Sequence, residues 1–149
     1  MKKNHLILLF VCTLALAGGI SLYARTSYSR VLEANWGVSL PLKALYREVY
    51  RQDNSGFHGD GIRYHVYRYE YEDYIELMFT WRSSEGETIF HGSFSQAAEF
   101  WLDELHVSPS YRPSYADCSY WYKAQADHSE LLIIWNSHNN HLYILESFL

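Results

Sequence analysis

The sequence predicts an α+β fold: an antiparallel sheet with one or two packed helices, preceded by a single N-terminal transmembrane helix. Residues 6–24 carry no charge and follow a basic start, which indicates the membrane helix. Short alternating or apolar runs separated by polar turns recur through the rest of the chain, and one stretch there shows clear helical spacing. Runs of strands with few helices favour an antiparallel sheet.

The N-terminal segments follow from charge and length. Residues 1–5 form a basic start, and residues 6–24 form a transmembrane anchor or a signal peptide. At about 1.5 Å per residue the apolar segment reaches roughly 28 Å, close to the hydrocarbon thickness of a bilayer. An Ala-x-Ala site at Ala15 and Ala17 keeps a cleaved secretory signal as the alternative. Apolar character continues through Ala24, which favours the anchor.

The expected location follows from the same segment. A short basic start before one apolar helix usually stays in the cytoplasm. We therefore expect a single-pass protein of the cell membrane, held by residues 6–24, with its domain outside the cytoplasm. Cleavage of the segment would instead make the protein secreted. Residues 25–35 are expected to be a juxtamembrane spacer, and residues 36–149 a single α+β extracytoplasmic domain.

Composition restricts the partners and the chemistry. Apart from Lys2 and Lys3, the chain carries 10 Lys and Arg against 17 Asp and Glu, a net charge of −7, which argues against nucleic acid and anionic lipid as partners. Cys118 is the only cysteine after residue 24, so the domain has no internal disulfide, and we expect this thiol to be buried. The HExxH, CxxC and GxSxG motifs are absent, and no cofactor is expected.

The first half of the domain begins with a strand and a loop. Residues 41–52 fit a strand that alternates through Leu45, Arg47 and Val49 better than the short helix that they also allow. Residues 53–61 hold three glycines and two aspartates, a composition that predicts a loop or tight turn.

Further strands are expected after this loop. Residues 62–72 alternate tyrosines with charged side chains and predict a strand. Residues 74–81 are apolar enough for another strand or for a buried helix. A polar turn over 82–87 and a short strand over 88–92 complete this half.

The clearest helix begins near Ser93 or Ser95, either of which can cap its first turn, and runs through Leu105. Its apolar residues recur at spacings of three and four, so one face should be buried. Pro109 and Pro113 mark a loop after it.

The C-terminal part predicts a β-hairpin. Two apolar runs, residues 131–135 and 142–145, flank Asn139 and Asn140, which tolerate the left-handed conformations of a two-residue hairpin turn. Both runs are apolar at successive positions, so we expect the two strands to lie centrally in the sheet with both faces covered.

The most motif-like stretch is Phe57-His58-Gly59-Asp60-Gly61. His58 and Asp60 are candidate catalytic residues, because an imidazole and a carboxylate two residues apart can share a proton or a metal ion. The same glycines also fit a turn that simply needs positive φ angles.

His138 and His141 are candidate metal ligands. Placed directly opposite each other beside the hairpin turn, they would have Cβ atoms about 5 Å apart. A stable zinc site needs further ligands, which the sequence does not identify, and solvated turn residues are the simpler interpretation.

A tyrosine-rich strand provides candidate binding residues. The chain has 14 tyrosines; Tyr67, Tyr69 and Tyr71 fall on one face of the expected strand, with Tyr64 nearby. Such amphipathic rings suit an interaction surface, and they suit core packing equally well.

These observations favour a membrane-anchored extracytoplasmic interaction domain without catalytic activity, which binds a protein or another component of the cell envelope through aromatic side chains. The alternative is a metal-dependent or acid/base enzyme of the cell envelope that uses His58 and Asp60.

Overall fold

The computed structural model describes residues 28–41, 45–54, 56, 60–80, 82–83, 95–115 and 118–149. The chain divides into two compact units, Met1–Leu42 and Lys43–Leu149. The predicted membrane segment, residues 6–24, lies outside the described residues, as does the short strand predicted over 88–92. Among the described residues, no helix combines the length and the apolar character needed to span a membrane.

The described part of the first unit is a helix over residues 28–36 and the segment that follows it. Gly37 ends the helix with a φ of 70°, and its N–H donates to the Glu33 carbonyl oxygen at 2.8 Å. Glycine adopts this left-handed conformation without a Cβ penalty. The Leu40 N–H then donates to Ser29 Oγ at 3.1 Å, which ties the following segment back to the first turn of the helix.

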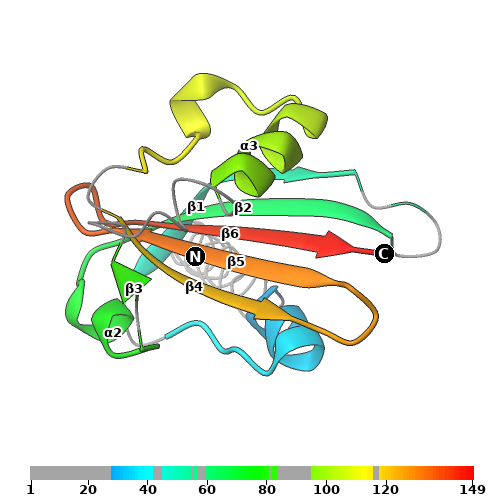
Figure 1. Ribbon diagram of the computed structural model, residues 1–149. Helices are drawn as coiled ribbons and strands as arrows, with labels where there is room; N and C mark the ends of the chain where they lie inside the picture. Colours follow the sequence, from blue (N-terminus) through cyan, green and yellow to red (C-terminus); the bar gives the residue numbers. More distant parts are fainter. Residues whose placement is uncertain are drawn as a thin grey trace, which may run out of the picture. The chain divides into compact units, whose positions relative to one another are not determined.

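The second unit is built on a six-stranded antiparallel sheet with the order β1-β2-β6-β5-β4-β3 (Figure 1). The strands are β1 (Tyr46–Asp53), β2 (Gly61–Tyr69), β3 (Arg82–Ser83), β4 (Cys118–Ala124), β5 (Glu130–Asn136) and β6 (His141–Phe148). Five strands are long, and the two-residue β3 lies at one edge. The predicted α+β class with an antiparallel sheet is therefore confirmed.

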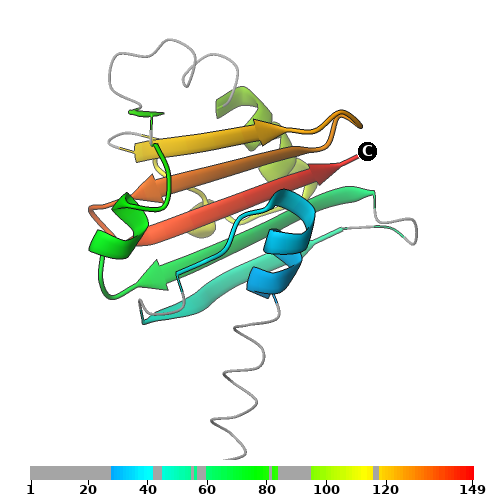
Figure 2. The ribbon, with the colours of Figure 1, turned by 90° about the horizontal axis from the view of Figure 1, so that it is seen from below.

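The helices of this unit are α2 (Asp73–Glu76), α3 (Ser95–Glu104) and the 3₁₀ turn η2 (Pro109–Tyr111). The α3 helix confirms the predicted helix, and it covers one face of the sheet (Figure 1). Figure 2 shows α2 at the end of the sheet where the turn between β5 and β6 lies.

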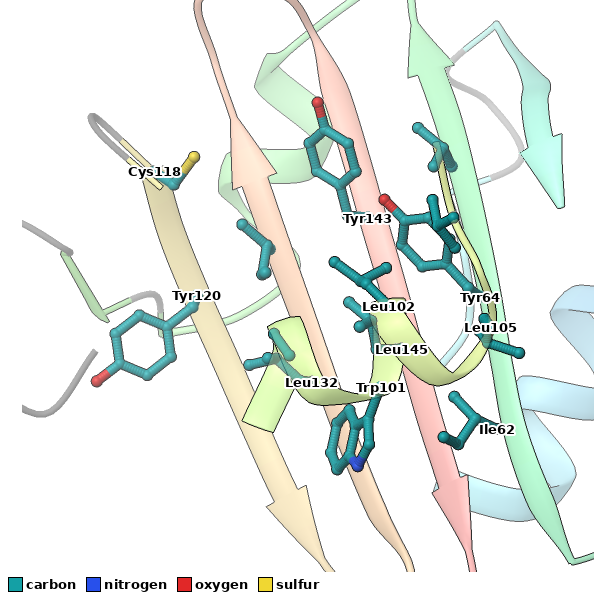
Figure 3. Close-up of a cluster of buried hydrophobic side chains, with 14 residues drawn as sticks. Ile62, Tyr64, Trp101, Leu102, Leu105, Cys118, Tyr120, Leu132, Tyr143 and Leu145 are labelled. Carbon is teal, nitrogen blue, oxygen red and sulfur yellow. The ribbon is translucent and has the colours of Figure 1, made fainter. Parts of the chain in front are cut away.

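The core lies between α3 and the sheet. Trp101 and Leu102 from α3 pack with Leu132 and Leu145 from the strands (Figure 3). Each large apolar side chain buried in this way contributes about 1.5–3 kcal/mol to folding. The predicted burial of Cys118 is confirmed, because this side chain belongs to the same cluster.

The C-terminal end of α3 closes without glycine. His106 takes a φ of 55°, its N–H donates to the Asp103 carbonyl oxygen, and the Val107 N–H donates to the Leu102 carbonyl oxygen, both at 2.9 Å. This is the Schellman arrangement, in which an apolar contact usually accompanies the hydrogen bonds. Leu102 and Val107 both lie in the core cluster and fit this pattern.

The C-terminal hairpin is central, as predicted, but its turn differs. Strand β6 pairs with β2 on one side and β5 on the other, and β5 also pairs with β4. The last pair before the turn joins Asn136 to His141, so the turn has four residues and not two. The Asn136 side-chain oxygen accepts the backbone N–H groups of His138 at 3.0 Å and Asn139 at 3.3 Å, which stabilises the longer turn.

Of the residues 74–81, those that the structure describes, 74–80, form neither the predicted strand nor a buried helix. Only the four-residue α2 is helical here, and Ile75 is the one residue of α2 that is buried. Glu76 interrupts the apolar run, and Glu72 and Asp73 directly precede it, so much of the segment lies in solvent.

Candidate functional site

Three of the four candidate tyrosines are buried, and they divide between the two faces of β2. Tyr64 packs in the core beneath α3, with its hydroxyl donating to the Tyr111 carbonyl oxygen at 2.6 Å. Tyr67 and Tyr69 are buried on the opposite face, as the period of two along a strand requires. Tyr71 lies beyond the end of β2 and is 54 % exposed. The expectation of three aligned rings therefore fails at Tyr71, because the strand ends before it.

The glycine-rich loop is described only in part. His58 lies outside the described residues, and Asp60 is exposed. The Asp60 carbonyl oxygen accepts the Gly56 N–H at 2.8 Å. The Asn54 side-chain oxygen accepts the Ile62 N–H at 2.7 Å, so the described ends of the loop carry hydrogen bonds typical of a turn. A catalytic role for His58 and Asp60 stays a prediction.

The two hairpin histidines are not cross-strand neighbours. His141 pairs with Asn136, and His138 lies within the four-residue turn, so the geometry expected for a shared zinc ion does not form in this hairpin. Within the described part of the chain, no group of three or more His, Cys, Asp and Glu side chains is arranged to hold a metal ion.

A cluster that the sequence did not predict joins β1 to β2. Glu48 Oε1 lies 2.5 Å from His65 Nδ1 and accepts the Tyr67 hydroxyl at 3.2 Å. The Glu48 side chain is 39 % exposed, whereas His65 is 1 % exposed. A carboxylate beside an imidazole is also found in acid/base catalysis, but a catalytic imidazole must reach a substrate. Burial of His65 favours a structural role for this cluster.

The neighbours of Glu48 favour its ionised form. Burial opposes ionisation of Glu48, but the hydrogen bond and electrostatic attraction of His65, the Tyr67 hydroxyl and the charge of Arg51 together lower the pKa of Glu48. Burial and the adjacent Glu48 carboxylate raise the pKa of Tyr67, so its hydroxyl stays protonated and donates.

The most distinctive exposed surface is the segment over residues 70–77, here called the acidic aromatic corner. It presents Tyr71, Tyr74 and Leu77, which are 54 %, 45 % and 86 % exposed. The same eight residues include four exposed carboxylates: Glu70, Glu72, Asp73 and Glu76. Figure 2 shows the α2 helix of this segment at the end of the sheet.

The fold holds the acidic aromatic corner at both ends. The Glu70 N–H donates to the Leu45 carbonyl oxygen at 2.9 Å, which fixes the exit from β2. The Glu72 carbonyl oxygen accepts the N–H groups of Ile75 at 2.8 Å and Glu76 at 3.1 Å. Ile75 is fully buried and anchors the single helical turn. The exposed rings are thus carried on an ordered backbone.

The carboxylates of the acidic aromatic corner form no ion pair within the part of the chain that the structure describes. The corner therefore combines exposed apolar side chains with a negative potential. In the sequence, the apolar residues of 74–81 indicate a core element, and only Glu76 within the run and the carboxylates before it signal an exposed segment.

Comparisons of the chain with protein-family models, with curated proteins and with solved structures find no significant match.

Proposed function

We propose that this protein is a non-enzymatic interaction domain that binds a basic, partly apolar segment of another protein at the acidic aromatic corner. The observation that carries this proposal is the exposure of Tyr71, Tyr74 and Leu77 among four carboxylates that have no ion-pair partner among the described residues. We also propose that the domain is held outside the cytoplasm by residues 6–24, where proteins of the cell envelope are the available partners.

A partner would gain binding energy by covering the exposed side chains of the acidic aromatic corner. Full burial of a side chain such as Leu77 contributes about 1.5–3 kcal/mol, and tyrosines are among the residues that most often dominate interface energies. Four carboxylates in eight residues select a partner with Lys or Arg, because like charges across an interface cost energy and opposite charges speed association. A basic segment with apolar side chains satisfies both requirements.

The enzyme alternative stays a prediction. Its candidate base, His58, lies outside the described residues. The imidazole that lies beside a carboxylate is that of His65, which is buried. We therefore base the proposal on the exposed surface.

A binding assay with defined probes tests the proposal. The full chain in phosphatidylcholine nanodiscs is titrated against a fluorescent peptide of alternating lysine and leucine, and against a peptide in which glutamate replaces lysine; empty nanodiscs provide the baseline. We expect fluorescence anisotropy to report binding of the lysine peptide only, with an affinity that falls as salt rises.

Paired variants locate the binding surface. The double change Tyr71→Ser and Tyr74→Ser should weaken binding of the lysine peptide by about tenfold or more. The matched control is Phe100→Ser on α3, because Phe100 is also an exposed aromatic residue, at 66 %. Equal binding by the double variant and the control, or equal binding of the two peptides, would overturn the proposal.

A further inference from the structure

Three basic side chains form a row across one end of the sheet. Arg47 on β1 pairs directly with Arg68 on β2, and Arg68 pairs directly with His141 on β6. Residues that pair in this way lie on the same face, with Cβ atoms of direct neighbours about 4.5–5.5 Å apart. Arg47, Arg68 and His141, here called the basic row, are therefore adjacent although they are far apart in the sequence.

Arg47 and Arg68 are exposed, and neither forms an ion pair with a carboxylate of the described residues. Like charges placed directly opposite in a sheet destabilise it. The contrast with Arg112 is direct, since its guanidinium lies 2.7 Å from both Glu99 and Asp103.

The environment of the His141 ring also bears on what the basic row can bind. Its Nδ1 atom is buried and has no hydrogen-bond partner among the described residues. The ring is half-buried and stacks on Tyr143, with 6.0 Å between the ring centroids. The ring of His141 therefore lies beside Arg68 with a polar atom whose hydrogen-bonding capacity is not used by the described residues.

We propose that the basic row binds a phosphate group. Two guanidinium groups present forks of N–H donors that match the oxygens of a phosphate, and their two charges match its charge. A carboxylate carries a single charge and is satisfied by one arginine, so a pair of arginines favours the phosphate.

The overall charge of the domain limits the size of the ligand. The net charge of the chain is −5, so a long polyanion or an extended anionic surface is repelled by the rest of the molecule. The ligand we infer is therefore a small soluble compound with a phosphate group. A phospholipid headgroup has the same chemistry and is distinguished by the experiment.

The test is isothermal titration of the full chain in neutral detergent micelles with inorganic phosphate, with acetate as the carboxylate probe. We expect saturable binding of phosphate and a weaker response to acetate. The change Arg68→Gln, alone or with Arg47→Gln, should raise the Kd for phosphate by about tenfold or more.

The matched control is Arg51→Gln, which removes the same charge from β1. Arg51 pairs with His65 and so lies on the other face of the sheet, and its side chain is 61 % exposed. Phosphate binding should persist in this variant. Thermal unfolding without phosphate checks the fold: Arg68→Gln should leave the midpoint unchanged or raise it, because a like-charge pair is removed.

Titrations in nanodiscs distinguish a soluble phosphate compound from a phospholipid headgroup as the ligand. If phosphate binds equally in phosphatidylcholine and phosphatidylglycerol nanodiscs, the ligand is a soluble compound; loss of binding in phosphatidylglycerol alone assigns the site to an anionic headgroup. The proposal is overturned by an absence of phosphate binding in micelles, by equal affinity for acetate, or by equal losses in Arg68→Gln and Arg51→Gln.

Discussion

Glu48 Oε1 lies 2.5 Å from His65 Nδ1 across the first strand pair of the sheet. The register shifts between Glu48 and Tyr50, and this bulge places Glu48 opposite Tyr67 while Arg51 lies opposite His65. Glu48 and Arg51 therefore share a face although they are three residues apart. The pairing of Glu48 with Tyr67 places the carboxylate beside two buried polar side chains, and the bulge that follows brings Arg51 to the same face.

Removal of this carboxylate should destabilise the domain. The change Glu48→Ala takes away the oxygen that His65 and Tyr67 both contact, and we expect the free energy of unfolding to fall by about 1–3 kcal/mol. Denaturation of the detergent-solubilised chain measures this. Gln52→Ala is the control, because Gln52 is exposed on the same strand. Equal effects of the two changes would contradict the account.

Glu48 should also contribute to the pH dependence of stability. Its pKa in the folded chain lies below the ordinary value of 4.5, so the unfolded chain takes up the proton first as the pH falls. This stabilisation is present above pH 4.5 and is lost as the pH falls through the folded-state pKa. Glu48→Gln should flatten the stability curve in that range, as denaturation midpoints would report. An unchanged slope would contradict a lowered pKa of Glu48.

His141 should make a separate contribution at a higher pH. Burial lowers the pKa of His141 from 6.5, and the charge of Arg68 also lowers it, whereas the hydrogen bond with the Asn139 backbone raises it. Asn136 and Tyr143 are the other neighbours of His141. Above pH 6.5 the His141 imidazole is neutral in both the folded and the unfolded chain. Below it the unfolded chain is protonated first, so stability falls until the pH passes the folded-state pKa. His141→Asn should remove this decline in denaturation midpoints, whereas a decline of the same size in the variant would assign it elsewhere.

Arg112 is expected to hold the end of α3 to the loop that follows. Its guanidinium contacts Glu99 and Asp103 at 2.7 Å, and its Nε–H donates to the Val107 carbonyl oxygen at 3.0 Å. Arg112→Lys keeps the charge but loses the fork of donors, so we expect a loss of about 1–2 kcal/mol in denaturation experiments. Arg47→Lys is the matched control; a similar loss there would mean that the fork has no special role.

The sequence predicted the elements whose patterns are local. Strand β2, helix α3 and the two strands of the hairpin all follow from residue spacing within one element. Strand β4 was not predicted, although CSYWYKA alternates in burial near its start. The short α2 was misread because an apolar composition does not distinguish a core element from an exposed turn that buries only Ile75.

The candidate sites depend on register, which the sequence does not encode locally. The pairing of Arg47 with Arg68 and of Arg68 with His141 follows from how β1 and β6 align with β2. The single bulge in β1 also decides that Arg51, and not Tyr50, lies opposite His65. A shift by one residue moves a side chain to the other face, so these neighbours require the structure.

The proposed location has its own test. Protease treatment of intact cells should digest the domain, and the chain should remain full-length and bound to the membrane, because residues 6–24 are proposed to be a retained anchor. A shortened soluble chain would show that the segment is a cleaved signal. Protection that persists until the membrane is opened would place the domain inside the cell.

The most direct test of the central claim is site-specific photo-cross-linking in living cells, with a photoreactive phenylalanine analogue at Tyr74 in the acidic aromatic corner and at Phe100 as the control. The account predicts an adduct from position 74 only, to a protein segment in which Lys or Arg lies next to apolar residues. That adduct should disappear when Glu70, Glu72, Asp73 and Glu76 are replaced by their amides. No adduct at position 74, an equal one at position 100, or an acidic captured segment would contradict the account.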